Sequence, residues 1–357
     1  MVAAKWLQNS IFIALVSPSI ALLLFAIHLP QPKSDWHLSF YPATLAWLQG
    51  SSPYAVPQFF NPPWTVMFLA PFTLQGEDWG RALLGLGTLA VVALAAATWS
   101  DTKQVRLLSL LLILTSPLTL RLAFIGQLDA LPLLGLILSE GGYLPTLSTL
   151  LVLVKPQVYI TGLILNRIFL KNLPWIAIAL FLASLPFGLD WPIQLLRSYQ
   201  AEPPYRDFTV STWRLATEVL NLPWWLVVLY ATSLLFIVFR YYLAYKDSKD
   251  KMVVLLVGTA LLTPYSSVAT TTVLLSLTLP RLLSANLYLG LATYALSLTP
   301  ILLVPFSTPA EVWLHLALWG WLLLALVIAK ELKSDSYTLD KGWGKCGEVG
   351  SPSISSY

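Results

Sequence analysis

Charged residues are scarce in this sequence: Lys, Arg, Asp and Glu make up 11% of its 357 positions. Soluble domains carry about a quarter charged residues, so this chain has little charge with which to keep a surface hydrated. Its hydrophobic share is 57%, and a soluble core at this length could not bury that much apolar surface. The composition excludes a soluble domain and predicts an integral membrane protein.

Cysteine is almost absent, and the single one, Cys346, lies in the polar C-terminal segment. One thiol excludes a disulfide framework and a thiolate metal site. The net charge of +4 is small and is not concentrated enough to indicate a nucleic-acid partner, so none is expected. No internal repeat is visible, and this disfavours the transporter folds that are built from repeats.

Long apolar runs, by contrast, are plentiful. A helix that crosses a bilayer needs about 20 apolar residues, and this length is met by the segments 10–30, 80–99, 172–190, 223–243, 285–305 and 312–330. The first of them is expected to be a retained span, because no small-residue cleavage site follows it. Shorter apolar stretches lie at 62–75, 106–121, 127–140, 142–154, 156–170, 252–266 and 268–280. We predict an all-α polytopic bundle of about 11 to 13 transmembrane or partial helices.

Basic segments indicate the orientation, because cytoplasmic loops are enriched in Lys and Arg. The segments 166–172 and 246–251, and the chain after Lys330, are therefore predicted to be cytoplasmic. Two polar loops, 31–61 and 191–222, then lie on the outer side. If 62–75 crossed the membrane, Lys103 and Arg106 would face outward, so this stretch is predicted to be a short or partial crossing. Residues 1–333 form the membrane domain, and 334–357 are expected to be a disordered cytoplasmic tail.

The first outer loop contains the pattern of an amphipathic helix. Trp36, Phe40, Ala43 and Trp47 recur at helical spacing, which predicts one apolar face lying in the membrane interface. Gly50 is expected to end this helix, before a proline-rich segment returns to the bilayer.

Asp35, at the start of that helix, is either an N-cap or a general base at the membrane–water boundary. An Asp followed by an aromatic-rich amphipathic helix, a Gly-x-x-Pro-Tyr step and an Asn-Pro-Pro step resembles the membrane glycosyltransferases of the GT-C superfamily. The closest resemblance is to glycosyltransferase family 87, the polyprenyl-phosphate-mannose-dependent mannosyltransferases and their relatives. The matching residues are Asp35, Gly50, Pro53, Tyr54, Asn61, Pro62 and Pro63.

Three later steps follow in the family's order, so that the resemblance covers roughly residues 10–280. Residues 124–129, Phe-Ile-Gly-Gln-Leu-Asp, resemble the family's Gly-Gln-x-Asn step, with Asp129 in place of Asn. Lys155-Pro156-Gln157 resembles its Lys-Pro step, and residues 262–266, Leu-Thr-Pro-Tyr-Ser, resemble its Ser-Pro-x-Ser step. The Trp and His that often continue the last step are missing here.

The resemblance implies an inverting glycosyltransferase at the outer face of the plasma membrane, with residues 1–333 as its catalytic domain. It would move a sugar, mannose or another hexose or pentose, from a polyprenyl-phosphate donor to a lipid or glycan acceptor. Asp35 would deprotonate the acceptor hydroxyl, and an inverting displacement needs no second carboxylate as nucleophile. Neither a cofactor nor a metal ion is expected. A hard cation wants several oxygen ligands, and Asp35 with Asp129 is the one pairing on offer.

The departing phosphate requires positive charge, and the candidates are Lys155, Arg121, Arg206 and Arg214. Lys155 lies between two apolar runs, where a charge is costly and marks function by default. The alternative is a lysine that snorkels from a helix end, and the same choice applies to Arg121. Arg206 and Arg214 belong to the second outer loop, where each is either a bidentate phosphate ligand or an ordinary loop residue.

Contacts to sugar or acceptor are predicted for His37, Tyr41, Asn61, Trp64, Gln127, Asp129 and Gln157. Each has a structural alternative. An interfacial histidine is often structural, Gln127 and Asp129 could satisfy free backbone groups at a helix boundary, and Trp64 could be an ordinary interfacial tryptophan.

The main alternative function is a polytopic transporter or flippase for a lipid-linked or small solute. Transporters place ionisable residues and broken helices near the membrane midplane, whereas Asp35, His37, Arg206 and Asp207 lie in outer loops of this chain. A third possibility, a non-catalytic scaffold subunit, gives no reason for an acidic residue beside a Pro-Pro re-entry. The sequence favours the enzyme.

Overall fold

The computed structural model describes residues 34–164, 167–201, 210, 212–263, 266–302 and 309–344. Every element in these ranges is a helix, as the sequence predicts; the expected span at 10–30 lies outside them. Within them, three helices are long and apolar enough to cross a membrane: α4 (Glu77–Trp99), α14 (Trp224–Ala244) and residues Trp313–Leu332 of α19 (Pro309–Gly344). Two bent helix pairs bring the total to five if each pair is counted as one span. The finer count of about 11 to 13 crossings stays a prediction.

The bent pairs owe their shape to proline and glycine. α5 (Lys103–Leu114) and α6 (Pro117–Ile125) meet at 56°, because Pro117 lacks the N–H that would continue α5. The second pair is α11 (Leu173–Ser184), with the short η3 (Leu185–Phe187), and α12 (Trp191–Ala201), which meet at 67°. Gly188 separates them at φ 77°, a left-handed conformation that glycine adopts without strain. The predicted outer loop 191–222 therefore begins as a helix.

The remaining helices of the bundle are α7 (Ala130–Glu140), α8 (Pro145–Val152), α9 (Pro156–Ile164), α10 (Arg167–Lys171), α15 (Ser248–Leu262), α16 (Thr270–Ala285), α17 (Leu287–Ser297) and α18 (Thr299–Leu302). Two very short elements, α13 (Thr212–Arg214) and the π-helix η5 (Leu215–Val219), precede α14. The single span predicted at 285–305 is divided instead into α17 and α18. Pro300, in the first turn of α18, disfavours a continuous helix.

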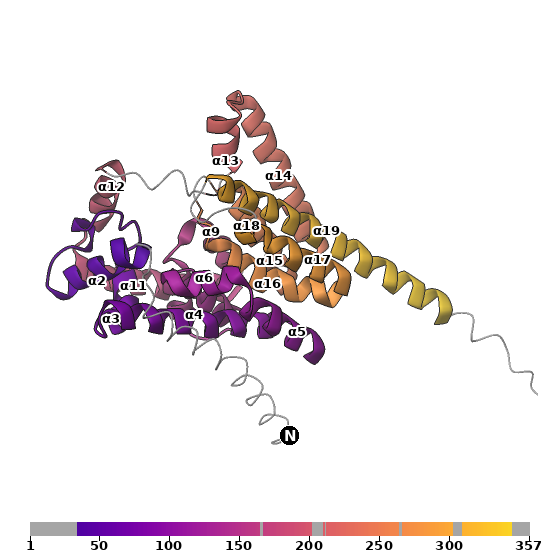
Figure 1. Cartoon of the computed structure of the whole chain (residues 1–357), viewed down its shortest axis with the longest axis horizontal. Helices are drawn as coiled ribbons and strands as arrows, with labels where there is room; N and C mark the ends of the chain where they lie inside the picture. Colours follow the sequence, from indigo (N-terminus) through magenta and orange to yellow (C-terminus); the bar gives the residue numbers. More distant parts are fainter. Residues whose placement is uncertain are drawn as a thin grey trace, which may run out of the picture.

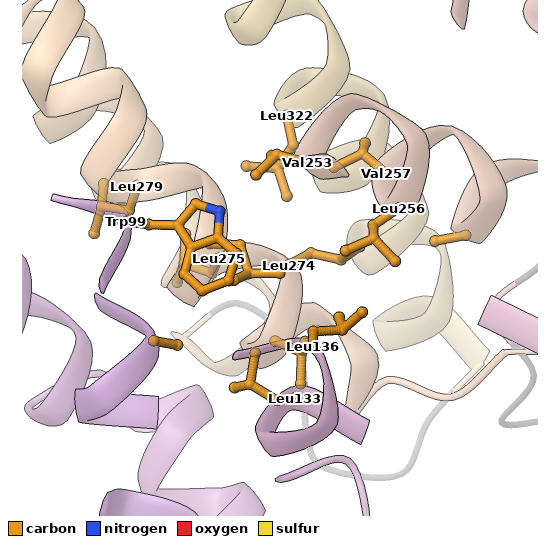
Figure 2. Packing of buried hydrophobic residues seen from close by; sticks show 14 of the residues in the cluster. Trp99, Leu133, Leu136, Val253, Leu256, Val257, Leu274, Leu275, Leu279 and Leu322 are labelled. Carbon is orange, nitrogen blue, oxygen red and sulfur yellow. The ribbon is translucent and has the colours of Figure 1, made fainter. Parts of the chain in front are cut away.

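The centre of the bundle is α16, whose residues from Thr270 to Leu283 are all buried. A helix that is buried on every side belongs to the core, and α16 contacts α4, α5, α15, α17 and α19. Figure 2 shows this packing, with Leu274 and Leu275 of α16 beside Trp99 of α4 and Leu256 of α15.

Apolar side chains cover the outside of α14. Trp224 is 76% exposed, Phe236 65% and Leu243 62%, and the helix projects from the rest of the bundle in Figure 1. An apolar face of this size is unfavourable in water and favourable in lipid. The structure therefore agrees with a helical membrane protein.

The stretch 62–75 does not cross the bundle. It forms α3 (Thr65–Thr73), nine residues long, which at 1.5 Å per residue spans only about 14 Å. Its last turn packs on the first turn of α4, where the carbonyl of Phe72 lies against Gly80. The segment is therefore short, as predicted.

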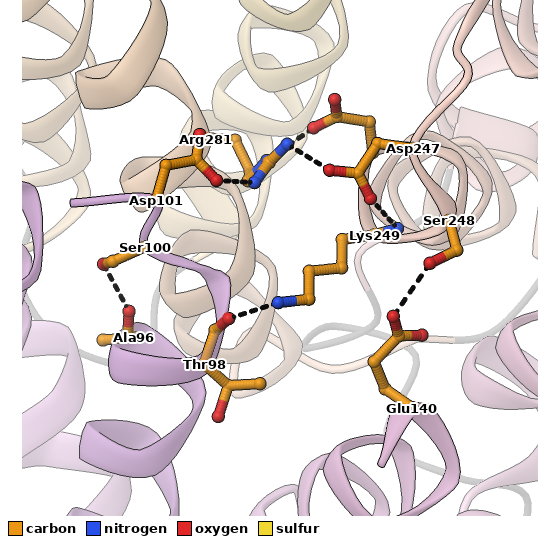
Figure 3. A network of polar contacts seen from close by, with 10 residues as sticks. Ala96, Thr98, Ser100, Asp101, Glu140, Asp247, Ser248, Lys249 and Arg281 are labelled. Carbon is orange, nitrogen blue, oxygen red and sulfur yellow. Dashed lines mark hydrogen bonds and ion pairs between the residues drawn. The ribbon is translucent and has the colours of Figure 1, made fainter. Parts of the chain in front are cut away.

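A network of charges closes the opposite end of the bundle (Figure 3). Arg281 of α16 donates to Asp101 and Asp250 at 2.5 Å each and to Asp247 at 2.8 Å. Lys249 Nζ donates to the carbonyl of Thr98 at 2.7 Å. The α4–α5 turn, which precedes Lys103, thus lies beside the basic segment 246–251, as the positive-inside argument requires.

The C-terminal helix is longer than expected. α19 continues to Gly344, whereas the sequence was expected to become a disordered tail at 334. No proline or glycine interrupts residues 321–341, so nothing in that stretch ends the helix. The predicted tail at 345–357 lies outside the described residues.

Candidate functional site

The segment predicted to be the first outer loop forms a helix where the sequence predicts one. The expectation that its apolar face lies in the membrane interface is wrong, because that face packs inside the protein. A π-helical turn η1 (Trp36–Phe40) leads directly into α2 (Tyr41–Leu48). Trp36, Phe40 and Ala43 form its buried face, and Trp47 stacks on Phe187 with ring centroids 5.5 Å apart. Gly50, at φ 81°, ends the helix. Beyond it lie a short 3-10 turn η2 (Pro53–Ala55) and then α3.

Asp35 stands at the N-cap position of this helix, but its carboxylate makes no capping hydrogen bond within the described residues. Its Oδ2 instead accepts a hydrogen bond from Gln127 Nε2 at 2.5 Å, across 92 residues of sequence. The interpretation of Asp35 as a helix cap is therefore not supported. Asp35 is exposed while Gln127 is buried, so the contact joins the surface of the loop to the end of the bundle.

Asp129, two residues after Gln127, is the centre of a second group of contacts. Lys155 Nζ lies 2.6 Å from Asp129 Oδ2, and the hydroxyl of Tyr159 donates to Oδ1 at 2.9 Å. Thr270 Oγ1 donates to the same Oδ1 at 3.2 Å. A fully buried carboxylate is costly unless it is paired and hydrogen-bonded, and Asp129 meets both conditions.

Helix starts explain why these groups meet. Asp129 precedes α7, Lys155 precedes α9, and Thr270 is the first residue of α16. The groups that bind this carboxylate therefore come from the starts of α9 and α16, two helices far apart in the sequence. As with Asp35, the side chain of Asp129 makes no capping bond to its own helix in the described part of the chain. The structure thus supports ion pairing rather than capping as its role.

The site lies near the N-terminal end of α4, a helix of 23 residues without a break. Trp36 Nε1 donates to the carbonyl of Glu77 at 2.8 Å, and Arg81 Nη1 donates to the carbonyl of Phe124 at 2.8 Å. Glu77 is the first residue of the 23-residue α4. Gln127 therefore lies about one turn from the end of that helix and far from its middle.

Asn61 and Trp64 hold the outer loop to the bundle. Asn61 Nδ2 donates to the carbonyl of Val154 at 3.0 Å, directly before Lys155, and Trp64 Nε1 donates to the carbonyl of Leu150 at 3.2 Å. The hydroxyl of Tyr54 donates to the carbonyl of Asn61 at 3.1 Å, and burial raises the pKa of that phenol. These donors are engaged inside the protein, so the predicted sugar contacts of Asn61 and Trp64 would need their other atoms or faces.

The three other predicted sugar or acceptor contacts lie around this group without joining it through a hydrogen bond in the described residues. His37 Nδ1 lies 2.9 Å from Ser34 Oγ, and its Nε2 lies 4.0 Å from Glu77. The ring of Tyr41 packs against that of Trp36 with centroids 5.8 Å apart. Gln157, in the first turn of α9, is exposed.

The predicted phosphate ligands are divided. Lys155 is at the site, where it is paired with Asp129. Arg121 is partly buried in α6. Arg206 lies outside the described residues, and Arg214 ends α13 with a side chain that is also outside them.

The second outer segment covers the first. Ser52 Oγ donates to Gln194 Oε1 of α12 at 2.6 Å. Three further aromatic contacts join the two: Trp64 meets Trp191 edge-on at 5.7 Å, Phe60 stacks on Tyr199 at 4.5 Å, and Trp47 stacks on Phe187. The first predicted outer loop and α12, the start of the second, therefore lie at one end of the molecule, at the left of Figure 1, whereas α13 lies beside α14 at the top.

Three residues at the site were missed by sequence reasoning. Tyr159 of α9 is four residues after Lys155, which directly precedes that helix, and this spacing of about one turn could have indicated it. Arg81 is a charge inside the apolar run 80–99, which is itself a functional signal in a membrane helix. Thr270 carries no comparable signal, because its role depends on how α16 packs.

The described residues contain no group of three or more His, Cys, Asp or Glu side chains that could hold a metal ion. Asp35 and Asp129 were the two carboxylates considered as ligands for a cation. In the structure each binds another side chain: Asp35 accepts from Gln127, and Asp129 pairs with Lys155.

Comparison of the sequence with models of known protein families finds no match, and no protein of curated function is found to be similar. The case for any activity therefore rests on the residues and contacts described above.

Proposed function

We propose that this protein is an inverting glycosyltransferase of the membrane, which uses a polyprenyl-phosphate sugar as donor and a lipid or glycan as acceptor. The observation that carries the proposal is the contact between Asp35 and Gln127 at 2.5 Å. It joins an exposed carboxylate to a buried side chain two residues before Asp129, which is paired with Lys155. The motif order that resembles the GT-C superfamily is consistent with it.

Asp35 would act as the general base. The acceptor hydroxyl loses its proton to the carboxylate, its oxygen attacks the anomeric carbon, and the bond from that carbon to the phosphate oxygen breaks. Polyprenyl phosphate leaves, and the anomeric configuration is inverted. A single carboxylate suffices because no glycosyl-enzyme intermediate forms. A base must reach the proton it removes, and the exposure of Asp35 meets this requirement.

Lys155 would contact the departing phosphate. Its ammonium carries three N–H donors, of which one is directed at Asp129, and its side chain is 13% exposed. Because Asp129 already neutralises Lys155, the pair contributes dipoles rather than a net charge. We therefore assign the remaining positive charge to Arg206 and Arg214, the other phosphate ligands that the sequence predicts.

The outer face of the plasma membrane is the expected location of the site. Lys249 and the turn before Lys103 gather at the opposite end of the bundle, and the positive-inside rule makes that end cytoplasmic. A membrane-embedded donor would present its phosphate at the outer end, where Trp224 and Trp225 begin α14 in the manner of an interfacial aromatic belt.

The alternative of a transporter or flippase is weakened by the depth of the site. Transporters bind their substrates near the bilayer midplane, whereas Trp36 and Arg81 fix this site to the first turn of α4. A flippase for a lipid-linked sugar would also need a route through the bundle. Its centre is filled by α16, which is buried along its length.

The test uses purified protein in proteoliposomes, given short polyprenyl-phosphate donors that carry radiolabelled mannose, glucose or a pentose, with an alkyl glycoside as acceptor. We expect transfer from one of these donors by the wild type. In Asp35→Asn the rate should fall by about 100-fold or more, the size of a general-base contribution, while the protein stays folded in detergent.

Asp190→Asn is the matched control, because Asp190 is also an exposed carboxylate at this end and contacts Gln194 of α12. It should retain transfer at the wild-type rate. Full activity in Asp35→Asn would reject Asp35 as the base, and absence of transfer from every donor by the wild type would count against the proposed function itself.

A further inference from the structure

We propose that Arg81 is a positioning residue, which fixes the end of α6 so that Gln127 meets Asp35. The role of Asp35 as a base rests on the proposed function. The positioning by Arg81 does not, because it is read from contacts within the protein.

Both halves of the Asp35–Gln127 contact are attached to one turn of α4. The carbonyl of Glu77 accepts from the indole of Trp36, the residue after Asp35. Four residues later the guanidinium of Arg81 donates to the carbonyl of Phe124, three residues before Gln127. Residues four apart on a helix lie on one face, so the loop and the end of α6 are held by adjacent positions.

The C-terminal end of α6 is closely packed against Trp36 and α4. Gly126, the residue before Gln127, ends α6 in the left-handed region at φ 65°. A Cβ added there would lie 3.0 Å from Trp36 Cβ and 3.3 Å from Arg81 Cγ. Trp36 also lies against Gly80 on its other side. The indole and the stem of Arg81 thus fill the space between α4 and Gly126, which leaves Gln127 little freedom to shift.

Arg81 is a costly residue to place here, since it is 1% exposed and lies in an apolar helix. Its Nη1 bonds to Phe124, while Nε and Nη2 have no partner among the described residues. An apolar side chain of similar length would fill the same space without burying a charge. What the guanidinium adds is a charge-assisted bond to a carbonyl in the last turn of α6, where the helix dipole favours a cation.

The experiment measures the proximity of positions 35 and 127 directly. Cysteines replace Asp35 and Gln127 in a Cys346→Ser background, which removes the chain's single native thiol. A short bifunctional methanethiosulfonate then cross-links the pair in proteoliposomes. Because both contacting side chains are absent, the rate reports how the backbone is held rather than the Asp35–Gln127 bond.

Arg81→Met should slow cross-linking by about tenfold, the effect expected from one charge-assisted hydrogen bond. Arg81→Lys, which can still donate to Phe124, should restore most of the rate. Thr88→Val is the matched control: Thr88 is buried in the same helix but bonds only to Leu84 of its own helix in the described structure. It should leave the rate unchanged.

Equal rates in Arg81→Met and the parent would overturn the proposal. So would equal slowing in Arg81→Met and Thr88→Val, since Arg81 would then act only through the general stability of α4. Should Arg81→Met fail to fold, Arg81→Gln removes the charge with a smaller change in polarity and is expected to slow the reaction likewise.

Transfer activity gives a second measurement, made with Asp35 and Gln127 intact. A misplaced base lowers kcat about tenfold while the donor KM stays unchanged, and Arg81→Lys should recover kcat. If the wild type transfers no sugar, the proposed function fails on its own, and the cross-linking rates still decide the role of Arg81.

Discussion

The ammonium of Lys155 lies 2.6 Å from a carboxylate oxygen of Asp129, and the carboxylate is fully buried. Each charge of this pair is stabilised by the other, since a buried charge without its partner is costly.

Removing one partner of the Asp129–Lys155 pair should reduce the free energy of unfolding more than expected from replacing both partners together. Asp129→Asn or Lys155→Met alone leaves one buried charge without its partner, and each should destabilise the protein by about 3 kcal/mol or more. The double variant should lose less than the sum of the two, because no unpaired charge remains. Thermal unfolding of the four proteins in detergent measures the coupling, and additive losses would show that the two charges act independently.

Tyr159→Phe removes one donor to Asp129 while the ring is kept. Lys155 and Thr270 still bind the carboxylate, so the loss should be about 1 kcal/mol. Thr270→Val removes the longer of the two hydroxyl contacts, 3.2 Å against 2.9 Å, and should cost no more than Tyr159→Phe. The measurement is again thermal unfolding, and a larger loss for Thr270→Val would contradict this ranking.

Gly126→Ala and Gly87→Ala should move stability in opposite directions. At Gly126 the backbone is left-handed and a Cβ meets Trp36 at 3.0 Å, so alanine should cost about 1 to 2 kcal/mol. Gly87 lies inside α4 with nothing within 4 Å of an added Cβ, and alanine there should gain about 0.5 to 1 kcal/mol. Melting temperatures that shift in the same direction would contradict the assigned backbone conformation.

At the other end of the bundle, Arg281→Met should be among the most damaging substitutions. It leaves Asp101, Asp247 and Asp250 close together without their shared cation, at a cost of about 3 to 5 kcal/mol. Asp101→Asn should cost less than about 1 kcal/mol, because that side chain is 44% exposed and two carboxylates still bind Arg281. Similar losses in the two variants would contradict the central role of the guanidinium.

The length of the apolar runs identified the three unbroken helices that are long enough to cross a membrane. The runs 80–99, 223–243 and 312–330 correspond to α4, α14 and the apolar part of α19. The breaks were harder to place. A proline shows where a helix is disfavoured, but tertiary packing decides whether it bends the chain, as at Pro117, or is accommodated within a helix, as Pro280 is in α16.

At the site, short motifs identified residues that do meet: Asp35 with Gln127, and Asp129 with Lys155. They did not indicate how these residues are paired, because contacts between residues 26 and 92 positions apart depend on how the helices pack. Thr270 was missed for the same reason, whereas Arg81 carried a sequence signal, a charge inside an apolar run. Asn61 matched a motif, yet the structure shows its amide bonded to the backbone of Val154.

The bond from Thr270 to Asp129 joins residues 141 positions apart, which bears on how the protein is made. A ribosome delivers Asp129 early, Lys155 soon afterwards, and Thr270 only after more than a hundred further residues. During that interval the carboxylate has its cation but lacks the start of α16. Until α16 is synthesised, the Asp129–Lys155 pair would have to hold the starts of α7 and α9 together without it. A chain that ends before α16 would leave the Asp129 carboxylate without the hydroxyl of Thr270.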